Sequence, residues 1–254
     1  MNEISSIIRA AEIMKCLTTG DHQLSLIARK LGYNKTTVYR VLKTLEKVGL
    51  AIQDPLTMLY YPGPLLSTLT NNFQNVHQIL NLIALKHMEA LRDAIVELVT
   101  LQVPMGTQRI IIEVAQVNKE FGFVRKRGSM SPIYTGAAGR VLLSKYADAE
   151  LSLLLESMDL KPVTEKTVVN KNVLFQQIKE VRLKGYAIES NEISLGITAI
   201  SVPIENYSCP IALTIAGMEN EIKKSADKLL KSLLNTSKTI SNKLSMASNT
   251  LNMG

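Results

Sequence analysis

The stretch from Leu31 to Leu50, which reads LGYNKTTVYRVLKTLEKVGL, limits the possible folds of this chain more than any other feature. One set of its residues is apolar and recurs every three or four positions, which predicts the buried face of a helix: Val38, Val41, Leu42 and Leu45. The opposite face is polar and basic, with Lys35, Thr36, Tyr39, Arg40 and Lys43. Six basic residues lie between Arg29 and Lys47, and only Glu46 opposes them. This face is either a solvated helix surface or a surface for a polyanion.

The preceding sequence predicts two more helices. Apolar residues fall on a helical period over residues 4–18, and LSLIARKLG forms a second short helix that ends at Gly32. Asn34 is a favourable N-cap for the third helix, which extends from Lys35 to about Val48.

A β-hairpin is expected after these helices. Residues 50–53 and 58–61 are β-prone, and Asp54 with Pro55 predicts a turn between them. Three short helices followed by a hairpin predict a winged helix-turn-helix DNA-binding domain over residues 1–63. The turn of the hairpin contains no Lys or Arg, so we expect this wing to contribute little to DNA binding.

The same arrangement predicts which residues contact DNA. In a helix-turn-helix the recognition helix enters the major groove of double-stranded DNA with its N-terminal residues first. Arg pairs with guanine, Thr reaches a base or a phosphate, and Lys usually contacts phosphate. The candidate DNA-binding residues are Ser25, Arg29, Lys30, Asn34, Lys35, Thr36, Thr37, Tyr39, Arg40 and Lys43. The net charge of +7 favours an anionic partner but does not identify that partner.

The rest of the chain has a different pattern. Residues 64–76 are expected to form a linker helix into a second domain over residues 77–254. There, β-branched runs of strand length alternate with helical segments, which predicts a mixed α/β domain with an antiparallel sheet. The expected strands are IVELVTLQV, RIIIEVAQV, EFGFVR, YAIESNEI, ITAISVPI and PIALTIAG. The expected helices are TGAAGRVLLSKYADAELSLLLESM, NVLFQQIKEVRLKG and the segment from Glu219 onward.

The sequence lacks the residue patterns of several kinds of functional site and of membrane segments. Cys16 and Cys209 are far apart and have no CxxC partner, so neither a disulfide framework nor a zinc site is expected. The chain contains no GxSxG, GxxxxGK[ST] or HExxH motif, so we expect neither an enzyme nor a cofactor. Charges interrupt the N-terminal apolar run, and no stretch reaches roughly 18 uncharged apolar residues. We therefore expect a cytoplasmic protein without a membrane partner.

Four segments match a known pattern in the same order. The first comprises IIRAAEIMKCL, LSLIARKLGYNKTTVYRVLKTLEKVGL and YYPGPLL. The other three are RGSMSPIYTGAAGRVLLS, KGYAIESNEISLGITAISVPI and IALTIAG. Each segment alone is a weak motif, but together they cover nearly the whole chain and resemble the IclR family of bacterial transcription regulators.

The resemblance implies an N-terminal winged helix and a C-terminal GAF-like effector domain, in dimers that often assemble as dimers of dimers. It implies an effector pocket lined by Ala137, Ala138, Glu189, Ile197, Ala199, Thr214 and Ala216. The chain departs from the family pattern with Tyr134 in place of a frequent His, Arg140 for Lys, Ala199 for Cys, and Thr214 and Ala216 for Ser. These departures predict a less polar pocket than in relatives that bind small keto acids.

Elementary electrostatics narrows the class of the effector. Backbone amides at the start of the TGAAG helix favour a carboxylate. Glu189 repels an anion unless it is protonated or bonds to a hydroxyl group. A small hydroxylated organic acid satisfies both features. The alternative is that the glycines and alanines there serve only helix–sheet packing.

The expected function is a ligand-responsive DNA-binding transcriptional regulator, and specifically a repressor of genes for small-metabolite catabolism. A homodimer or tetramer is expected, in which the apolar face of residues 65–90 and the first helix form the interface. The alternative is a small-molecule sensor or an enzyme whose basic N-terminal unit mediates protein contacts. RNA binding is less favoured because only 5% of the residues are aromatic and no stacking platform is evident.

Overall fold

The computed structural model describes residues 4–66, 68–69, 77–95, 97–116 and 124–251, with side chains up to residue 247. The chain divides into two compact units, Met1–Val76 and His77–Gly254. Most of the expected linker helix over residues 64–76 lies outside the described residues, although residues 65, 66, 68 and 69 are helical.

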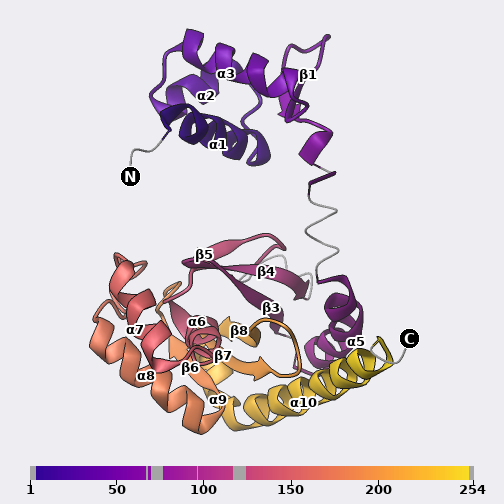
Figure 1. The fold of residues 1–254 in the computed structure, drawn as a ribbon, viewed down its shortest axis with the longest axis vertical. Coiled ribbons are helices and arrows are strands. Elements are labelled where there is room, and N and C mark those ends of the chain that lie inside the picture. Colours follow the sequence, from indigo (N-terminus) through magenta and orange to yellow (C-terminus); the bar gives the residue numbers. More distant parts are fainter. Residues whose placement is uncertain (1–3, 67, 70–76, 96, 117–123, 252–254) are drawn as a thin grey trace. The chain divides into compact units, whose positions relative to one another are not determined.

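The N-terminal unit consists of helices and a hairpin (Figure 1). Its helices are α1 (Ser5–Thr18), α2 (Leu24–Leu31) and α3 (Lys35–Lys47). The strands β1 (Ala51–Gln53) and β2 (Tyr60–Pro62) pair antiparallel, with Ile52 opposite Tyr61. Gly32 ends α2 in the left-handed conformation, with φ at 67°, which lets the chain turn directly into α3. The expected winged helix-turn-helix fold is confirmed.

The core of this unit explains the apolar stripe of α3. Val38, Leu42 and Leu45 are buried there, against Ile13, Cys16, Leu17, Ile27, Ala28, Ala51 and Tyr60. The apolar residues of α1 divide between two environments, because Ile7 and Ile8 are exposed, like Ile4 just before the helix, whereas Ile13 and Leu17 are buried. The helical period of α1 therefore predicted a helix correctly, but it did not show that part of the apolar surface faces solvent.

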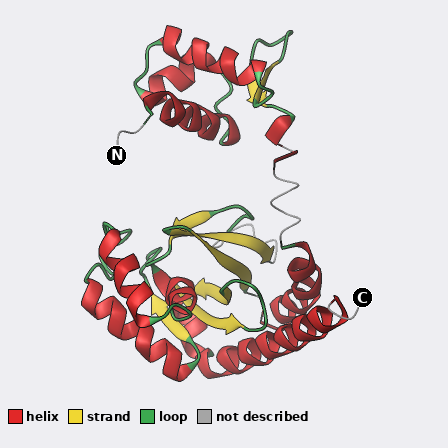
Figure 2. Cartoon of the chain, in the orientation of Figure 1, coloured by secondary structure: helices red, strands yellow, loops and turns green. Residues whose placement is uncertain are grey.

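The C-terminal unit is built on a six-stranded antiparallel sheet with the order β5-β4-β3-β8-β7-β6 (Figure 2). The strands are β3 (Leu98–Met105), β4 (Gln108–Ala115), β5 (Met130–Pro132), β6 (Ala187–Ser190), β7 (Ile197–Ile204) and β8 (Ile211–Met218). The helices are α5 (Gln78–Ile95), α6 (Gly136–Leu143), α7 (Asp148–Ser157), α8 (Lys171–Lys184), α9 (Glu219–Lys224) and α10 (Ala226–Leu251). This arrangement confirms the expected α/β domain.

The two faces of the sheet carry different cores. Helices α5 and α10 cover one face, where their apolar residues pack on the odd-numbered side chains Val99, Leu101 and Val103 of β3. Helices α6, α7 and α8 lie over the other face. Because side chains alternate along a strand, Leu98, Thr100 and Gln102 point to this second face. Alternate side chains of β3 therefore point into the core under α5 and α10, and the side chains between them point toward α6.

Several expected elements have different bounds. The long helix predicted after Thr135 is two helices, since α6 ends at Leu143 and α7 begins at Asp148, where the Glu150 side chain accepts a hydrogen bond from the Ala147 amide at 3.3 Å. The helix expected from Glu219 is likewise divided at Ser225. Most of the strand expected over EFGFVR lies outside the described residues, and residues 124–126 are not in a strand.

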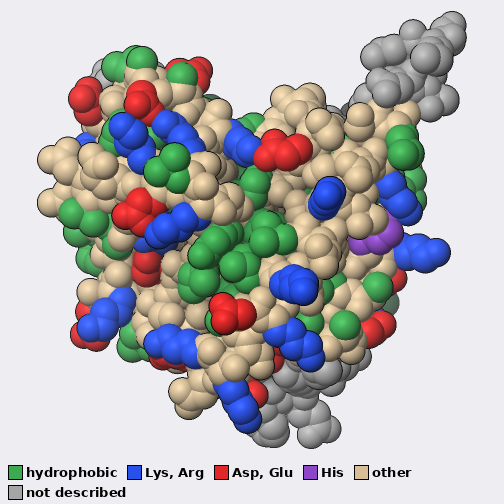
Figure 3. Space-filling model, turned by 90° about the horizontal axis from the view of Figure 1, so that it is seen from below, with side chains coloured by type: hydrophobic (Ala, Val, Ile, Leu, Met, Phe, Trp, Pro, Cys, Tyr) green, Lys and Arg blue, Asp and Glu red, His purple; other side chains and the backbone are tan. Residues whose placement is uncertain are grey.

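The surface shows no single charged field on the face seen in Figure 3. Basic and acidic side chains alternate there around an apolar area. Among the described residues, no helix is long and apolar enough to cross a membrane.

Candidate functional site

The outward face of α3 presents the polar side chains that the sequence predicted. Lys35, Thr36, Tyr39 and Arg40 are exposed, and Thr37 is half-buried. Arg40 forms no ion pair with a described residue, so its guanidinium group is available to a partner. On the preceding helix, Arg29 is also exposed and forms no ion pair with a described residue, whereas Ser25 is half-buried. The exposed face of α3 therefore has the donors that a phosphate or a base edge requires.

Asn34 has a structural role within its own helix. Its side-chain Oδ1 accepts hydrogen bonds from the backbone amides of Thr36 at 2.9 Å and Thr37 at 3.2 Å. These bonds satisfy two of the amides that a helix start leaves without partners. The N-cap predicted from the sequence is confirmed, and the Asn34 side chain is directed at α3 itself.

Two of the candidate lysines are paired within the protein. Lys43 Nζ lies 2.8 Å from Glu46 Oε2 and 3.0 Å from Gln53 Oε1, which ties α3 to the first strand of the hairpin. Lys30 pairs with Asp21. Hydrogen bonds to these carboxylates raise the pKa of both lysines. Each lysine must loosen an existing contact before it can bind phosphate fully.

The hairpin is apolar at its tip. Leu56 and Met58 are exposed, and Asp54 holds the turn by accepting hydrogen bonds from the Leu56 amide at 2.9 Å and the Thr57 hydroxyl at 2.8 Å. No Lys or Arg occurs between Val48 and Leu85. The hairpin therefore offers no cationic side chain to DNA.

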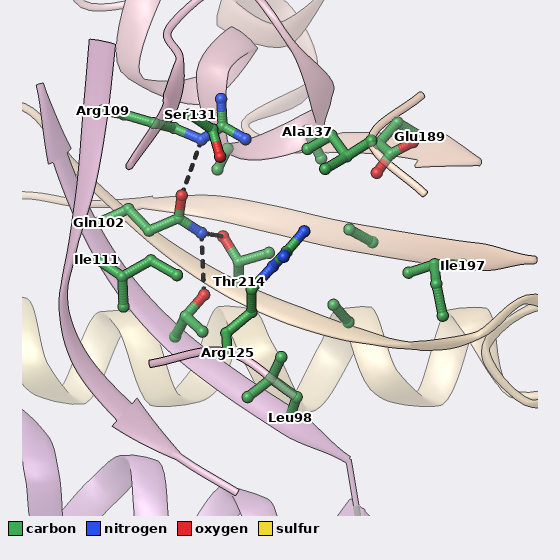
Figure 4. A pocket seen from close by; sticks show the side chains of 15 residues that line it. Leu98, Gln102, Arg109, Ile111, Arg125, Ser131, Ala137, Glu189, Ile197 and Thr214 are labelled. Carbon is green, nitrogen blue, oxygen red and sulfur yellow. Dashed lines mark hydrogen bonds between the residues drawn. The ribbon is translucent and has the colours of Figure 1, made fainter. Parts of the chain in front are cut away.

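A pocket in the C-terminal unit brings together residues from distant parts of the sequence (Figure 4). It encloses about 500 Å³ of empty space, including the part open to solvent. All seven predicted effector residues line it: Ala137, Ala138, Glu189, Ile197, Ala199, Thr214 and Ala216. Strand register explains this, because Leu98, Ala216, Ala199 and Glu189 stand opposite one another in a row across β3, β8, β7 and β6.

Sequence reasoning missed the polar end of this pocket. Gln102 Nε2 donates to Thr100 Oγ1 at 2.9 Å and lies 3.5 Å from Thr214 Oγ1, while Gln102 Oε1 accepts from Arg109 Nε at 2.8 Å. Figure 4 shows these groups at the opposite end of the pocket from Glu189. The other lining residues not foreseen are Leu98, Ile111, Arg125, Ser131 and Ile193. The pocket is therefore more polar than the substitutions at Ala199, Thr214 and Ala216 suggested.

Arg109 is the most unusual group in the pocket. It is buried, and its Nη1 donates to the Pro132 carbonyl at 2.5 Å and the Thr135 hydroxyl at 3.0 Å. It forms no ion pair with any described residue, and burial lowers the pKa of Arg109 to about 10. A buried cation that has only neutral partners is stabilised by an incoming anion. Its signal in the sequence was an arginine at the head of the apolar run RIIIEV.

Glu189 lies at the other end of the pocket. Burial raises the pKa of Glu189 to about 7, although its Oε2 accepts a hydrogen bond from the Glu192 amide at 3.0 Å. The side chain is therefore protonated in a large fraction of molecules near neutral pH, and it can then donate a hydrogen bond to a ligand.

The start of α6 is only partly available to a ligand. The Gly136 amide donates to Glu192 Oε2 at 3.2 Å, so the protein already supplies a carboxylate there. Gly139 serves packing, because a Cβ atom at this position would stand 2.0 Å from the Ile133 carbonyl oxygen. Ala137 and Ala138 line the pocket. The small residues of this segment thus divide between helix packing and the pocket wall.

Two family models match the chain. The helix-turn-helix domain of IclR matches residues 6–55, and the C-terminal domain of the bacterial transcriptional regulator IclR matches residues 74–242. The chain belongs to the IclR family of bacterial transcriptional regulators. The fold, the family resemblance and the expectation of a regulator rather than an enzyme are thereby confirmed.

Individual regulatory proteins are similar to this chain over most of their length. The HTH-type transcriptional regulator TtgV of Pseudomonas putida is 28% identical over 247 residues, which cover 96% of this chain and 93% of the relative. The glycerol operon regulatory protein of Streptomyces coelicolor is 31% identical over 80% of both chains. A crystal structure of an IclR homologue from Microbacterium hydrocarbonoxydans, complexed with 4-hydroxybenzoate, has a TM-score of 0.75 at 19% identity. It covers 94% of this chain and 98% of its own.

The family membership settles the general role of the two units. This IclR-family chain is a DNA-binding transcriptional regulator with a C-terminal effector-binding domain. The outward face of α3 belongs to its helix-turn-helix domain, and the pocket beneath α6 belongs to its effector domain. Among the described residues, no group of His, Cys, Asp and Glu is arranged to hold a metal ion.

Proposed function

We propose that the pocket binds a small hydroxylated carboxylic acid and that this ligand changes the affinity of the protein for its operator. The observation that carries the proposal is the buried Arg109, which has only neutral hydrogen-bond partners. A ligand carboxylate supplies the negative charge that this guanidinium lacks. Arg109 Nε and Nη1 already donate to protein oxygens, so Nη2 is the nitrogen that can form a charge-assisted hydrogen bond with the ligand carboxylate.

The end of the pocket at Glu189 favours a ligand that carries a hydroxyl group. Protonated Glu189 donates a hydrogen bond and ionised Glu189 accepts one, so a hydroxyl group suits both states whereas a second carboxylate does not. Apolar side chains between the two ends, including Leu98, Ile111 and Ile197, favour a ligand with a hydrophobic body. The structural homologue that holds 4-hydroxybenzoate, an acid of this class, agrees with the proposal.

The proposed regulator consists of a DNA-binding domain over residues 1–63, a linker helix over residues 64–76 and an effector domain over residues 77–254. DNA contact is assigned mainly to the outward face of α3, with Arg29 and Lys30 on phosphate. One recognition helix reads only a few base pairs, so two copies on a near-palindromic operator are required. We assign it to the cytoplasm as a homodimeric or tetrameric repressor of catabolic genes.

Calorimetry on the full chain tests the ligand class. The probes are 4-hydroxybenzoate, gluconate and pyruvate, with 4-hydroxybenzamide as the neutral counterpart of the first. We expect a hydroxylated acid to bind the wild type, the neutral amide to bind at least about tenfold more weakly, and Arg109→Met to remove that preference. Ala138→Phe, which fills the pocket, should abolish binding. Equal binding of acid and amide would overturn the carboxylate assignment.

Linkage provides the test of regulation. Fluorescence anisotropy with the DNA upstream of the protein's own gene measures operator affinity with and without the bound acid. If the acid lowers operator affinity by some factor, the operator must lower the affinity for the acid by the same factor. A ligand that binds but leaves operator affinity unchanged would contradict the regulatory proposal while the pocket assignment stands.

A further inference from the structure

A second cavity lies behind α6, between α8 and the edge strand β6. It encloses about 720 Å³ of empty space, including the part open to solvent. Its lining residues are Arg140, Gln177, Glu180, Val181, Lys184, Tyr186, Ala187, Ile188 and Glu192, none of which lines the effector pocket. The two cavities are therefore separate sites within one domain.

Arg140 is the group that makes this cavity unusual. Its side chain is 5% exposed, its Nε donates to Gln177 Oε1 at 2.9 Å, and its Nη2 lies 2.5 Å from Glu192 Oε1. The remaining nitrogen, Nη1, is buried and has no hydrogen-bond partner among the described residues. Buried polar groups are nearly always paired, and a charged donor without an acceptor costs free energy. Arg140 lines the cavity, so an acceptor for its guanidinium group can be placed there.

The other polar groups of the cavity favour an acceptor too. The Gln177 carbonyl is occupied by Arg140, which leaves its amide group to donate. Lys184 pairs with Glu180 at 2.8 Å, and more than half of each side chain is exposed, so solvent weakens this pair and a ligand can share the ammonium group. Glu192 is held by Arg140 and by the Gly136 amide. Two cationic donors therefore line the cavity, while the Glu180 carboxylate is exposed and the Glu192 carboxylate is already bound by protein donors.

We propose that this cavity is a second ligand site, which takes a small oxyanion of the carboxylate or phosphate type. The Arg140 guanidinium group and the Lys184 ammonium group are its principal donors, and the Gln177 amide is a third. Planar guanidinium groups recognise both kinds of oxyanion through the same hydrogen bonds. The site is distinct from the effector pocket, because the two cavities share no lining residue.

The test is an NMR titration of the arginine side-chain N–H signals of the full chain. Inorganic phosphate or acetate is added at constant ionic strength, set with sodium chloride, and Arg140→Lys identifies the signal of Arg140. We expect a saturable shift of that signal with at least one of the two anions. The anion that saturates it assigns the site to phosphate or carboxylate chemistry. A shift that is absent or grows linearly with both anions would overturn the proposal.

Matched variants connect the binding to the cavity. Lys184→Met should weaken the anion at least about fivefold, since it removes one of two cationic donors. Lys179→Met removes a lysine on the same helix that pairs with Asp148 outside the cavity, and it should leave the affinity within about twofold. Ala138→Phe, which fills the effector pocket, should also leave it unchanged. Equal weakening by both lysine variants, or loss of binding in Ala138→Phe, would place the anion elsewhere.

Discussion

Arg140 Nη2 lies 2.5 Å from Glu192 Oε1, and less than a tenth of either side chain is exposed. This buried pair joins α6 to the loop that follows β6. The second carboxylate oxygen of Glu192 accepts from the Gly136 amide, and its backbone carbonyl accepts from the Thr167 hydroxyl at 2.8 Å. One glutamate therefore fixes the helix start and the loop that border the effector pocket.

Removing Glu192 should destabilise the effector domain strongly. Glu192→Ala leaves the Arg140 charge buried without a counter-ion, which costs about 3–5 kcal/mol. Urea unfolding followed by circular dichroism measures the change. The control is Asp159→Ala, which breaks an ion pair with Lys161 in which 79% of each side chain is exposed, and it should change the unfolding curve little. Similar losses in both variants would show that burial of the pair is unimportant.

Asn34 should act through helix capping. Asn34→Ala removes the acceptor of the Thr36 and Thr37 amides, which costs about 0.5–2 kcal/mol, whereas Asn34→Ser retains a cap. Thermal unfolding of the N-terminal unit measures the stability of each variant. Operator affinity of Asn34→Ser should remain near that of the wild type. A stable Asn34→Ser protein with a large loss of affinity would instead make Asn34 a direct DNA contact.

Arg40 and Lys43 should differ in their effect on DNA binding. Arg40 is exposed and unpaired among the described residues, so Arg40→Ala should cost about 1–3 kcal/mol of operator binding. Lys43→Ala should have a smaller effect, uniform across DNA sequences, because Lys43 already pairs with Glu46 and Gln53. Anisotropy titrations over a range of salt concentrations separate these outcomes. A larger loss in Lys43→Ala than in Arg40→Ala would contradict this ranking.

The stability of the effector domain should depend on pH through Glu189. Burial raises its pKa from 4.5 to about 7. The hydrogen bond from the Glu192 amide lowers this pKa, the Glu192 charge raises it, and the charges of Arg140 and Arg109 lower it. The folded state therefore binds more protons than the unfolded state between these two values, and stability falls as pH rises through that window. Relative to Glu189→Gln, the wild type should lose up to about 3 kcal/mol from about pH 5 to about pH 8.

The same titration should affect the effector. Ionised Glu189 repels a ligand carboxylate, so the affinity for a hydroxylated acid should fall as pH rises through about 7. Glu189→Gln removes this pH dependence because the amide does not titrate. Calorimetry at several pH values measures both proteins. Parallel pH profiles in the two proteins would exclude Glu189 as the titrating group.

Exposed apolar residues should mediate self-association. Leu82 on α5 is 71% exposed, beside the exposed Ile79, and Ile7 lies on the exposed face of α1. Leu82→Glu or Ile7→Glu should weaken the dimer, because either change places a charge in an apolar contact. Analytical ultracentrifugation measures the dissociation constant. Leu183→Glu is the control, since Leu183 is 89% exposed on α8, and a stable wild-type monomer at micromolar concentration would contradict the dimer.

Local patterns in the sequence determined the N-terminal fold. Its signals each involve only a few neighbouring residues, so they can be recognised from the sequence alone. They are the helical period of Val38, Leu42 and Leu45, the Asn34 cap and the Gly32 turn. The strands β7 and β8 were also foreseen closely, because their β-branched runs are bounded by turn residues. The family resemblance placed seven residues that line the pocket, which residue types alone would not have selected.

Tertiary structure alone decided the electrostatics of the pocket. Arg109 reads in the sequence as an ordinary charged residue beside a strand, and only the pairing of β3 with β4 and the cover from β5 enclose it beside Gln102 and Thr135. The pairing of Arg140 with Glu192 likewise joins residues 52 positions apart. Periodicity reports which side of an element faces inward. Burial and partners set the cost of a charge, and both depend on contacts between segments that the linear order of residues does not specify.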